Sequence, residues 1–152
     1  MIRNKSMKRA TLASAIVATS AMVLSIVPAH ADSTGVTATS IKLGVSTPLT
    51  GSAGLVYGKV PGAMRAYFDY INANGGVNGR KISLVIRDDK YLPTLAATQT
   101  TNLILKDKVF ALVGALGTAT HSKAYTAAAL AKNNVPDLFI NTGFSGFTNK
   151  AK

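Results

Sequence analysis

A stretch with two different hydrophobic periods, residues 41–89, constrains the fold of this chain more than any other feature. Apolar residues alternate with polar or small ones at Ile41, Leu43 and Val45, which predicts a β-strand. Pro48 and several glycines then interrupt the alternation, so residues 46–58 are expected to form a loop. From Lys59 onward the spacing becomes helical, with an apolar face at Val60, Ala63, Met64, Tyr67, Phe68 and Ile71 and a solvent face at Lys59, Arg65, Asp69 and Asn72.

The predicted helix is followed by clear stop and turn signals. Pro61 suits its first turn, and Asn74-Gly75-Gly76 is expected to end it, because glycine tolerates the left-handed backbone of helix ends. Asn78-Gly79 then predicts a tight turn into a second strand over residues 81–87. The unit is therefore strand, long loop, helix, strand. A loop at the carboxyl end of a parallel strand is where open α/β sheets bind small molecules.

The rest of the chain continues the alternation of helices and strands. We predict a second helix from Leu92 to about Lys106 and a continuous apolar strand over residues 109–113. A third helix is predicted from His121 to Asn133, and a fourth strand over residues 138–140. Connections of helix length predict a parallel sheet with right-handed crossovers. The expected fold class is α/β, with flanking helices on a parallel sheet and no sign of a second domain.

The first 31 residues have the pattern of a secretory signal peptide. Basic residues precede an apolar run over residues 10–27, and Ala29-His30-Ala31 supplies a small-residue cleavage site. We expect cleavage after Ala31 and a periplasmic or extracellular protein. An uncleaved membrane anchor is the alternative, but the run is short and contains several Ser and Thr residues.

Charge and cysteine content exclude some classes of site. Residues 1–31 hold four of the 17 Lys and Arg residues and none of the six acids, so the mature part would carry a net charge near +7. Binding of nucleic acid or anionic lipid would be a functional explanation of that charge. The basic residues are scattered without an aromatic-interleaved stripe, which favours an ordinary solvated surface and no nucleic-acid partner. The absence of cysteine excludes disulfides, thiolate metal sites and a Cys nucleophile.

Three loops rich in Gly, Thr and Ser follow the first, third and fourth predicted strands, over residues 46–58, 114–120 and 141–147. In a parallel sheet these loops converge on one edge. Hydroxyls and backbone N–H groups at a helix N-terminus suit an anionic group such as a carboxylate. Thr118 is therefore a candidate ligand residue, although Thr is also a common helix N-cap.

Several motifs occur in the same order as in a known family. They are Thr47-Pro48-Leu49-Thr50-Gly51, Tyr57-Gly58, Gly62-Ala63, Ile71-Asn72-Ala73-Asn74-Gly75-Gly76 and Asp88-Asp89. Together they resemble the opening part of the branched-chain amino acid (leucine-binding protein) family of ABC transporter substrate-binding proteins. The resemblance covers nearly all of the chain beyond the leader, and such receptors are more than twice as long.

This resemblance has implications for fold and function. It implies that residues 32–152 form a truncated N-terminal lobe of a type I periplasmic-binding-protein fold, with strand order 2-1-3-4. It implies a receptor that is monomeric when full length and binds a branched-chain amino acid or a similar small carboxylate or amide. An ABC transporter permease would be its partner.

The resemblance also implies ligand-binding positions. Thr118 falls where such receptors place a hydroxyl on the ligand carboxylate, Gly143 and Ser145 where a backbone group and a second hydroxyl complete that subsite, and Tyr57 where an aromatic ring flanks the ligand. Simpler explanations are an ordinary loop hydroxyl for Ser145 and a core-covering loop aromatic for Tyr57. The chain departs from the family pattern in a longer loop before Tyr57, in Gly117 and Ala119, and in the bulky Phe144. Because of these departures, the resemblance does not indicate which solute side chain the protein would prefer.

Other chemistry-bearing residues point to structural roles. Asp88-Asp89 could be a metal or acid/base pair, but adjacent side chains at a strand end point to opposite sides, which suits caps and turns. His121 has no further metal ligand at suitable spacing and is expected to be a surface or first-turn helix residue. Ser145 lies in Gly143-Phe144-Ser145-Gly146, which lacks the context of a nucleophile elbow. We therefore expect no catalytic residue, metal or cofactor.

A fragment of a Rossmann-type dinucleotide-binding enzyme is the alternative function. It shares the strand-loop-helix-strand unit and an acid at the end of the second strand. Gly51, Gly54 and Gly58 do not give G-x-G-x-x-G, however, and the loop is too long to hold a pyrophosphate tightly on the helix. The sequence favours a binding protein, and bound NAD(H) would favour the enzyme.

Overall fold

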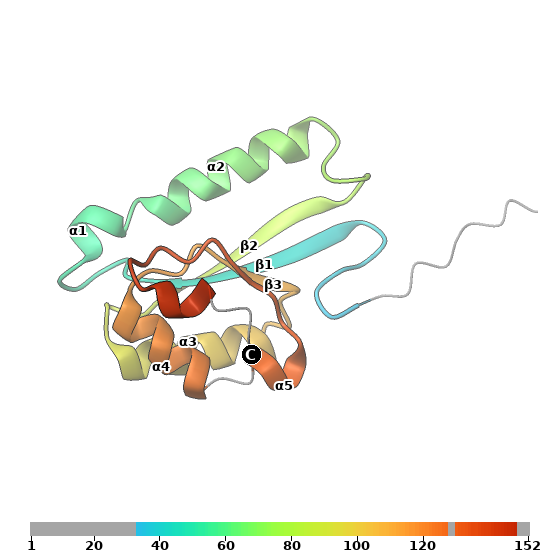
Figure 1. The fold of residues 1–152 in the computed structure, drawn as a ribbon. Coiled ribbons are helices and arrows are strands. Elements are labelled where there is room, and N and C mark those ends of the chain that lie inside the picture. Colours follow the sequence, from blue (N-terminus) through green and yellow to red (C-terminus); the bar gives the residue numbers. More distant parts are fainter. Residues whose placement is uncertain (1–32, 128–129, 149–152) are drawn as a thin grey trace, which may run out of the picture.

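The computed structural model describes residues 33–127 and 130–148. Its fold is built around one parallel sheet (Figure 1). The strands are β1 (Ser40–Thr47), β2 (Lys81–Asp88), β3 (Ala111–Val113) and β4 (Asp137–Leu138). The helices are α1 (Gly54–Tyr57), α2 (Val60–Ala73), α3 (Pro93–Leu105), α4 (Thr118–Ala127), α5 (Leu130–Asn133) and the 3-10 helix η1 (Ser145–Thr148). The strands are all parallel in the order β2-β1-β3-β4, which confirms the predicted fold class and strand order.

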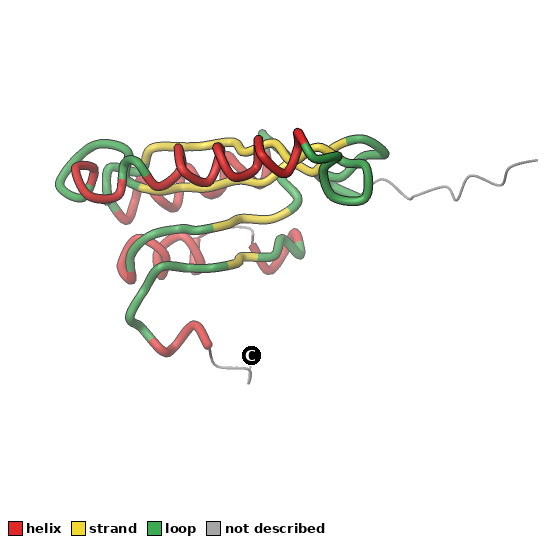
Figure 2. The backbone as a smooth tube through the Cα atoms, turned by 90° about the horizontal axis from the view of Figure 1, so that it is seen from above, coloured by secondary structure: helices red, strands yellow, loops and turns green. Residues whose placement is uncertain are grey.

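Helices cover both faces of the sheet, but not equally. Figure 1 shows α1 and α2 on one face and α3 and α4 on the other. α2 contacts β2, whereas α3 contacts β1, β2 and α4. Seen from above in Figure 2, α2 lies over β1 and β2 while β3 and β4 lie to its side. Within the described ranges, the α2 face of β3 and β4 is therefore left without a helix.

The core lies between the sheet and α3. Leu103, Ile104, Val109 and Leu112 form a buried cluster. Gly44 of β1 permits this packing, because a Cβ at that position would lie 3.0 Å from the side chains of Leu103 and Val109. The carboxyl half of β1 is fully buried as a result. This half of the strand leads directly into the loop that carries Tyr57.

The amphipathic prediction for α2 is correct in part. Pro61 is buried in the first turn, as expected. Of the predicted apolar face, Met64, Phe68 and Ile71 are half-buried, but Val60, Ala63 and Tyr67 are exposed. The reason is the narrow surface beneath the helix, since α2 covers only two strands.

The prediction that Asn72 faces solvent is wrong. Its side-chain nitrogen donates to the carbonyl of Ile82 at 2.8 Å, and its Oδ1 accepts the N–H of Ile82 at 2.7 Å. β2 is an edge strand of the described sheet, so Ile82 has backbone groups that β1 does not use. An Asn at the end of α2 satisfies both, because a buried backbone group without a partner is costly.

Several boundaries differ from the sequence prediction. The short helix α1 interrupts the expected loop 46–58, and α4 begins at Thr118 rather than at His121. The strand predicted over residues 138–140 is β4, which ends at Leu138. Phe139 ends it by adopting a left-handed backbone, with φ of 56°. The predicted third helix corresponds to α4 and α5, and residues 128–129 between them lie outside the described ranges.

The predicted leader, residues 1–31, also lies outside the described residues, so its cleavage stays a prediction. Across residues 33–127 and 130–148, no helix has both the length and the apolar character needed to cross a bilayer.

Candidate functional site

The candidate site is built on the loops that follow β1, β3 and β4. These strands are parallel, so their carboxyl ends, Thr47, Val113 and Leu138, lie toward the same edge of the sheet. Figure 1 shows the start of α4 and the helix α1 at this edge. The position agrees with the general rule that open α/β sheets bind ligands beyond their strand carboxyl ends.

Two of these loops are joined by a hydroxyl pair. Thr118 Oγ1 and Thr142 Oγ1 lie 2.7 Å apart, and the N–H of Phe144 donates to Thr142 Oγ1 at 3.2 Å. The backbone supports the pair, because Gly117 N–H donates to the Asn141 carbonyl at 3.0 Å and Asn141 N–H to the Ala115 carbonyl at 2.8 Å. The loops after β3 and β4 thus form one hydrogen-bonded unit with two adjacent hydroxyls.

The structure places the four predicted ligand residues as follows. Thr118 is the first residue of α4, and Gly143 directly follows Thr142, so these two are brought together. Gly143 is exposed, and a Cβ added there would meet no atom within 4 Å. Ser145 is exposed and begins η1. Tyr57 is half-buried at the end of α1, on the separate loop after β1.

Thr142 is a site residue that the sequence analysis did not single out. Its hydroxyl both contacts Thr118 and accepts the Phe144 N–H, so it shapes the segment around Gly143. Its place beside Gly143 in a loop rich in small polar residues was the available signal. The contact between Thr142 and Thr118 could not be predicted from local sequence patterns, because the two residues are 24 positions apart.

The loop before α4 is held from within. The Thr120 hydroxyl is buried and donates to the carbonyls of Leu116 and Gly117, and His121 N–H donates to the Gly117 carbonyl at 3.1 Å. Thr118 therefore starts a firmly bonded helical turn. Hydroxyls next to a helix N-terminus can hold a carboxylate, because the helix end favours negative charge.

Asp88 and Asp89 have structural roles, as predicted. Asp88 accepts bonds from the N–H groups of Leu49, Thr50 and Lys90 and from the Thr50 hydroxyl. Asp89 accepts the Ser46 hydroxyl at 3.0 Å and the Tyr91 N–H at 2.9 Å. The two carboxylates thus attach the loop after β2 to the loop after β1.

The two carboxyl groups have opposite pKa shifts. Burial raises the pKa of Asp89, and the hydrogen bonds from Tyr91 and Ser46 only partly offset this effect. Desolvation also acts to raise the pKa of Asp88, but the bonds from Thr50, Lys90 and Leu49 together outweigh it and lower the pKa. A more exposed, heavily bonded carboxylate therefore adjoins a buried one.

His121 is not a surface residue, which corrects that part of the prediction. It lies in the first turns of α4, as expected, but is only 4% exposed. Its Nε2 lies 3.1 Å from Asp137 Oδ2, and its ring meets Phe147 edge to face at 4.8 Å. Asp137 and Phe147 are distant in sequence and were not recognised as neighbours. Among the described residues, no group of three or more His, Asp or Glu could hold a metal ion.

Three basic residues of the described chain have well-defined polar contacts. Arg87 binds both carboxylate oxygens of Asp107, at 2.7 and 3.0 Å, and hydrogen bonding to Asp107 raises the Arg87 pKa. Lys42 donates to the Asp107 carbonyl at 3.0 Å, and Arg80 to the Thr37 carbonyl at 2.9 Å. Arg87 and Lys42 thus both bind Asp107, whereas Arg80 binds the segment before β1.

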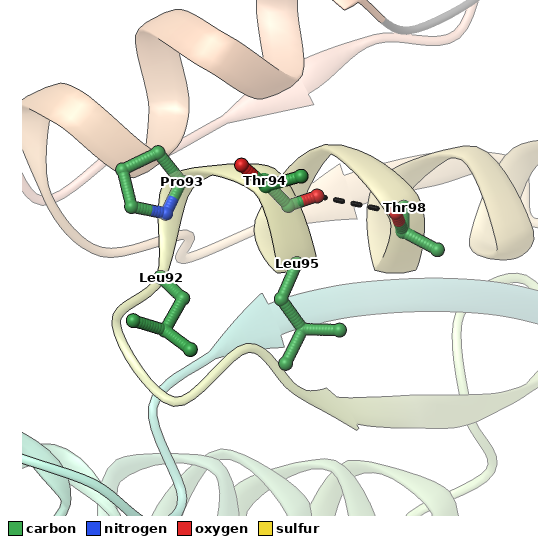
Figure 3. A pocket seen from close by; sticks show the side chains of 5 residues that line it. All are labelled: Leu92, Pro93, Thr94, Leu95 and Thr98. Carbon is green, nitrogen blue, oxygen red and sulfur yellow. Dashed lines mark hydrogen bonds between the residues drawn. The ribbon is translucent and has the colours of Figure 1, made fainter.

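A hollow of ≈ 470 Å³ lies at the start of α3, and none of the four predicted residues lines it. It is lined by Leu92, Pro93, Thr94, Leu95 and Thr98. Figure 3 shows Leu92 and Leu95 on one side of the first turn, and the Thr98 hydroxyl bonded to the Thr94 carbonyl at 3.1 Å. The hollow is open and mostly apolar, and it offers no charged partner for a carboxylate.

Known proteins resemble this chain over most of the described region. Residues 40–152 match the family described as "periplasmic binding protein". An "amino acid binding protein" of Pseudomonas aeruginosa is 43% identical over 77 residues, which are 49% of this chain and 20% of that protein.

Two solved structures extend the similarity to the fold. The branched-chain amino acid transporter substrate-binding protein LivJ of Streptococcus pneumoniae, in complex with isoleucine, is 30% identical with a TM-score of 0.65, covering 72% of this chain and 31% of that chain. A fatty acid ABC transporter substrate-binding protein of Thermomonospora curvata is 32% identical with a TM-score of 0.58, covering 66% and 25%. The chain thus spans less than a third of each of these relatives.

Proposed function

Because this chain belongs to the periplasmic binding protein family, we propose that it forms part of the N-terminal lobe of an extracytoplasmic receptor that binds an amino acid or a similar small carboxylate or amide for an ABC transporter. The resemblance read from the sequence motifs is confirmed by the family match and by the isoleucine-bound relative. The family is one of non-enzymatic transport components. The expectation of a binding protein is thereby confirmed, and the dinucleotide-binding alternative is not supported.

The observation that carries the proposal is the hydroxyl pair of Thr118 and Thr142 beside Gly143. A solute carboxylate placed there would find the hydroxyl proton that the pair leaves free, backbone N–H groups and the N-terminus of the ten-residue helix α4. Each of these groups favours negative charge. Ser145, two residues beyond Gly143, would supply a third hydroxyl, and Tyr57 would approach from the loop after β1.

The relatives support a carboxylate as the common group of the solute. Isoleucine, amino acids in general and fatty acids differ in their side chains but share a carboxyl group. A site that recognises this group through hydroxyls and backbone N–H groups tolerates such variety, because the side chain binds elsewhere. An amide would need an acceptor for its NH₂ group at the same place, so the two solute classes are separable by experiment.

We further propose that the receptor closes two lobes on the solute about a hinge, as other two-lobed binding proteins do. The described residues contribute loops from one lobe. A permease would then recognise the closed, solute-bound form of the receptor. The family implies an extracytoplasmic location, and cleavage of the leader after Ala31 would release the receptor in soluble, monomeric form.

The test is calorimetry on a full-length receptor that carries residues 32–152. L-leucine, L-leucinamide and a medium-chain fatty acid are titrated separately into protein freed of endogenous solute. Binding of an acid with at least about tenfold preference over its amide supports the proposal. The proposal is overturned if the receptor binds none of the three compounds, or if it is purified with bound NAD(H).

A further inference from the structure

Tyr91 joins two loops that belong to strands on different sides of β1. It lies in the loop after β2, at the edge of the sheet, whereas Gly117 lies in the loop after β3. A Cβ added to Gly117 would lie 2.6 Å from Tyr91 Cε2 and 3.1 Å from Tyr91 Oη. The tyrosine ring therefore rests on the open side of Gly117, immediately before Thr118.

The backbone of Tyr91 is held in an unfavourable conformation. Lys90 and Tyr91 have φ values of 54° and 62°, a left-handed region that residues with a Cβ seldom adopt twice in succession. Asp89 stabilises this turn by accepting the Tyr91 N–H at 2.9 Å, and Leu92 N–H donates to the Asp89 carbonyl at 2.8 Å. Strain of this kind persists only where the surroundings fix it, and it clusters at functional sites.

The same turn is fixed from its other side. Gly51, in the loop after β1, lies so close to Lys90 that a Cβ there would be 2.6 Å from the Lys90 carbonyl oxygen. Asp88 adds bonds to Leu49 and Thr50 of that loop. The turn is thus anchored to the loop after β1 and presents its aromatic ring to the loop after β3.

Gly117 receives this ring contact in addition to the hydrogen bonds of its own N–H and carbonyl groups. Its φ is +97°, which glycine adopts easily and leaves easily, and Gly114 of the same loop has φ +71°. Gly117 N–H donates to the Asn141 carbonyl, directly before Thr142, so a change in the Gly117 conformation would move Thr118 relative to Thr142.

We propose that Tyr91 is a positioning residue for Thr118, since its ring on Gly117 holds the loop before α4 where the Thr118 hydroxyl meets Thr142. The inference rests on the proposed function for its effect on solute affinity. The phenol hydroxyl is not required by this role, whereas the ring is. Tyr91 itself is 39% exposed, so it can be replaced without opening the core.

The variants follow from the left-handed backbone. Tyr91→Asn removes the ring but keeps a residue that tolerates positive φ, and Tyr91→Gly is a second ring deletion without backbone strain. Tyr91→Phe keeps the ring and removes only the hydroxyl. Tyr70→Ala is the matched control, because Tyr70 is an exposed tyrosine on α2.

Hydrogen exchange of the full-length receptor tests the loop without any solute. We expect Tyr91→Asn and Tyr91→Gly to speed exchange in peptides spanning residues 114–121 about tenfold or more, whereas Tyr91→Phe and Tyr70→Ala behave like the parent. Unchanged exchange in both ring deletions overturns the proposal. So does a Tyr91→Phe variant that exchanges like the ring deletions, since the hydroxyl would then be the essential group.

Titration with L-leucine tests the consequence for binding. Tyr91→Asn should weaken affinity about tenfold in the parent, yet change it less than about twofold in a Thr118→Ala background, because residues that act through one another are not additive. A full additional loss in that background overturns the positioning role. If the parent receptor binds no L-leucine, the proposed solute is wrong, while the exchange experiment still decides whether Tyr91 holds the loop.

Discussion

The hydroxyl oxygens of Thr118 and Thr142 lie 2.7 Å apart, although 24 positions separate the residues in the sequence. One begins α4 and the other lies in the loop after β4. The pair exists because β3 and β4 are neighbouring parallel strands whose following loops meet. It links the loops after β3 and β4 at the carboxyl edge of the described sheet.

The first prediction concerns this arrangement in a full-length receptor. Thr118→Ala, Thr142→Ala and Ser145→Ala should each weaken binding of the amino acid, because a buried carboxylate would lose a hydroxyl donor. The expected cost is about 1–3 kcal/mol per hydroxyl, or roughly a five- to 150-fold loss of affinity. Calorimetry with L-leucine measures it.

The control for that series is Thr98→Ala, since Thr98 is an exposed threonine of α3 whose hydroxyl bonds only the preceding turn. L-leucinamide provides a second control, and its binding should change little in all variants. If Thr118→Ala and Ser145→Ala both bind the acid as the parent does, the carboxylate subsite lies elsewhere.

The second prediction uses the opposite pKa shifts of Asp88 and Asp89. Because the Asp89 pKa is raised in the fold, its contribution to stability is complete below the unfolded pKa of about 4 and is lost as pH rises through the folded value. The Asp88 pKa is lowered, so its contribution is present above about pH 4 and is lost as pH falls through its folded value.

Thermal unfolding between about pH 3 and 7 separates the two neighbours. Asp89→Asn should gain stability relative to the parent as pH rises above about 4, whereas Asp88→Asn should lose stability relative to the parent as pH rises toward about 4. Each variant serves as the control for the other. Curves that shift in parallel would contradict the assigned environments.

The third prediction is that residues 32–152 alone are marginally stable and bind no solute tightly. Leu138 is 45% and Phe139 83% exposed on and beside β4, an edge strand within the described part of the chain. Exposed apolar edges promote association. We expect a broad, low-temperature unfolding transition and concentration-dependent mass in light scattering.

Phe139→Asn should reduce that association, because Asn tolerates the left-handed backbone at this position and removes the aromatic ring. Tyr70→Ala, on the far side of the fold from β4, is the matched comparison. A sharp, reversible, monomeric transition with micromolar solute affinity would refute the idea of an incomplete lobe.

The fourth prediction is that the exported product begins at Asp32. It rests on the basic start, the apolar run and the Ala29-His30-Ala31 site of the sequence. Intact-mass analysis of secreted material measures the N-terminus. A mature product that still carries Met1 would rule out the cleavage.

Local patterns predicted the order of the main strands and helices and the parallel sheet, but not the short helices α1 and η1. The alternation at Ile41–Val45, the helical period after Lys59 and the apolar run before Gly114 each reflect one element and its own burial. They do not reveal contacts between elements. Asn72 was placed on the solvent side, because its partner Ile82 belongs to a strand whose outer edge is open only in the folded sheet.

In the candidate site, too, single residues could be predicted from the sequence but contacts between elements could not. Thr118 stood out from the residue types of its loop and Gly143 from the family resemblance, whereas Thr142 depends on a contact between loops. Gly117 was noted as a departure from the family pattern, and its packing under Tyr91 required the turn geometry of Lys90 and Tyr91. His121 was expected at the surface or in the first turn of a helix. It lies in the first turn of α4, and its burial was not predicted because it depends on Asp137 and Phe147.

The central position of β1 has a consequence for how fast this sheet can assemble. Ser40 pairs with Lys81 and Leu43 pairs with Ala111, so each pairing of β1 with β2 or β3 closes a chain segment that contains at least one whole helix. Such non-local closures carry an entropic cost before any ladder bond forms, which slows folding. We expect stopped-flow refolding in milliseconds to seconds rather than microseconds. The chain would therefore remain without its central strand pairings for longer than a protein built mainly from local contacts.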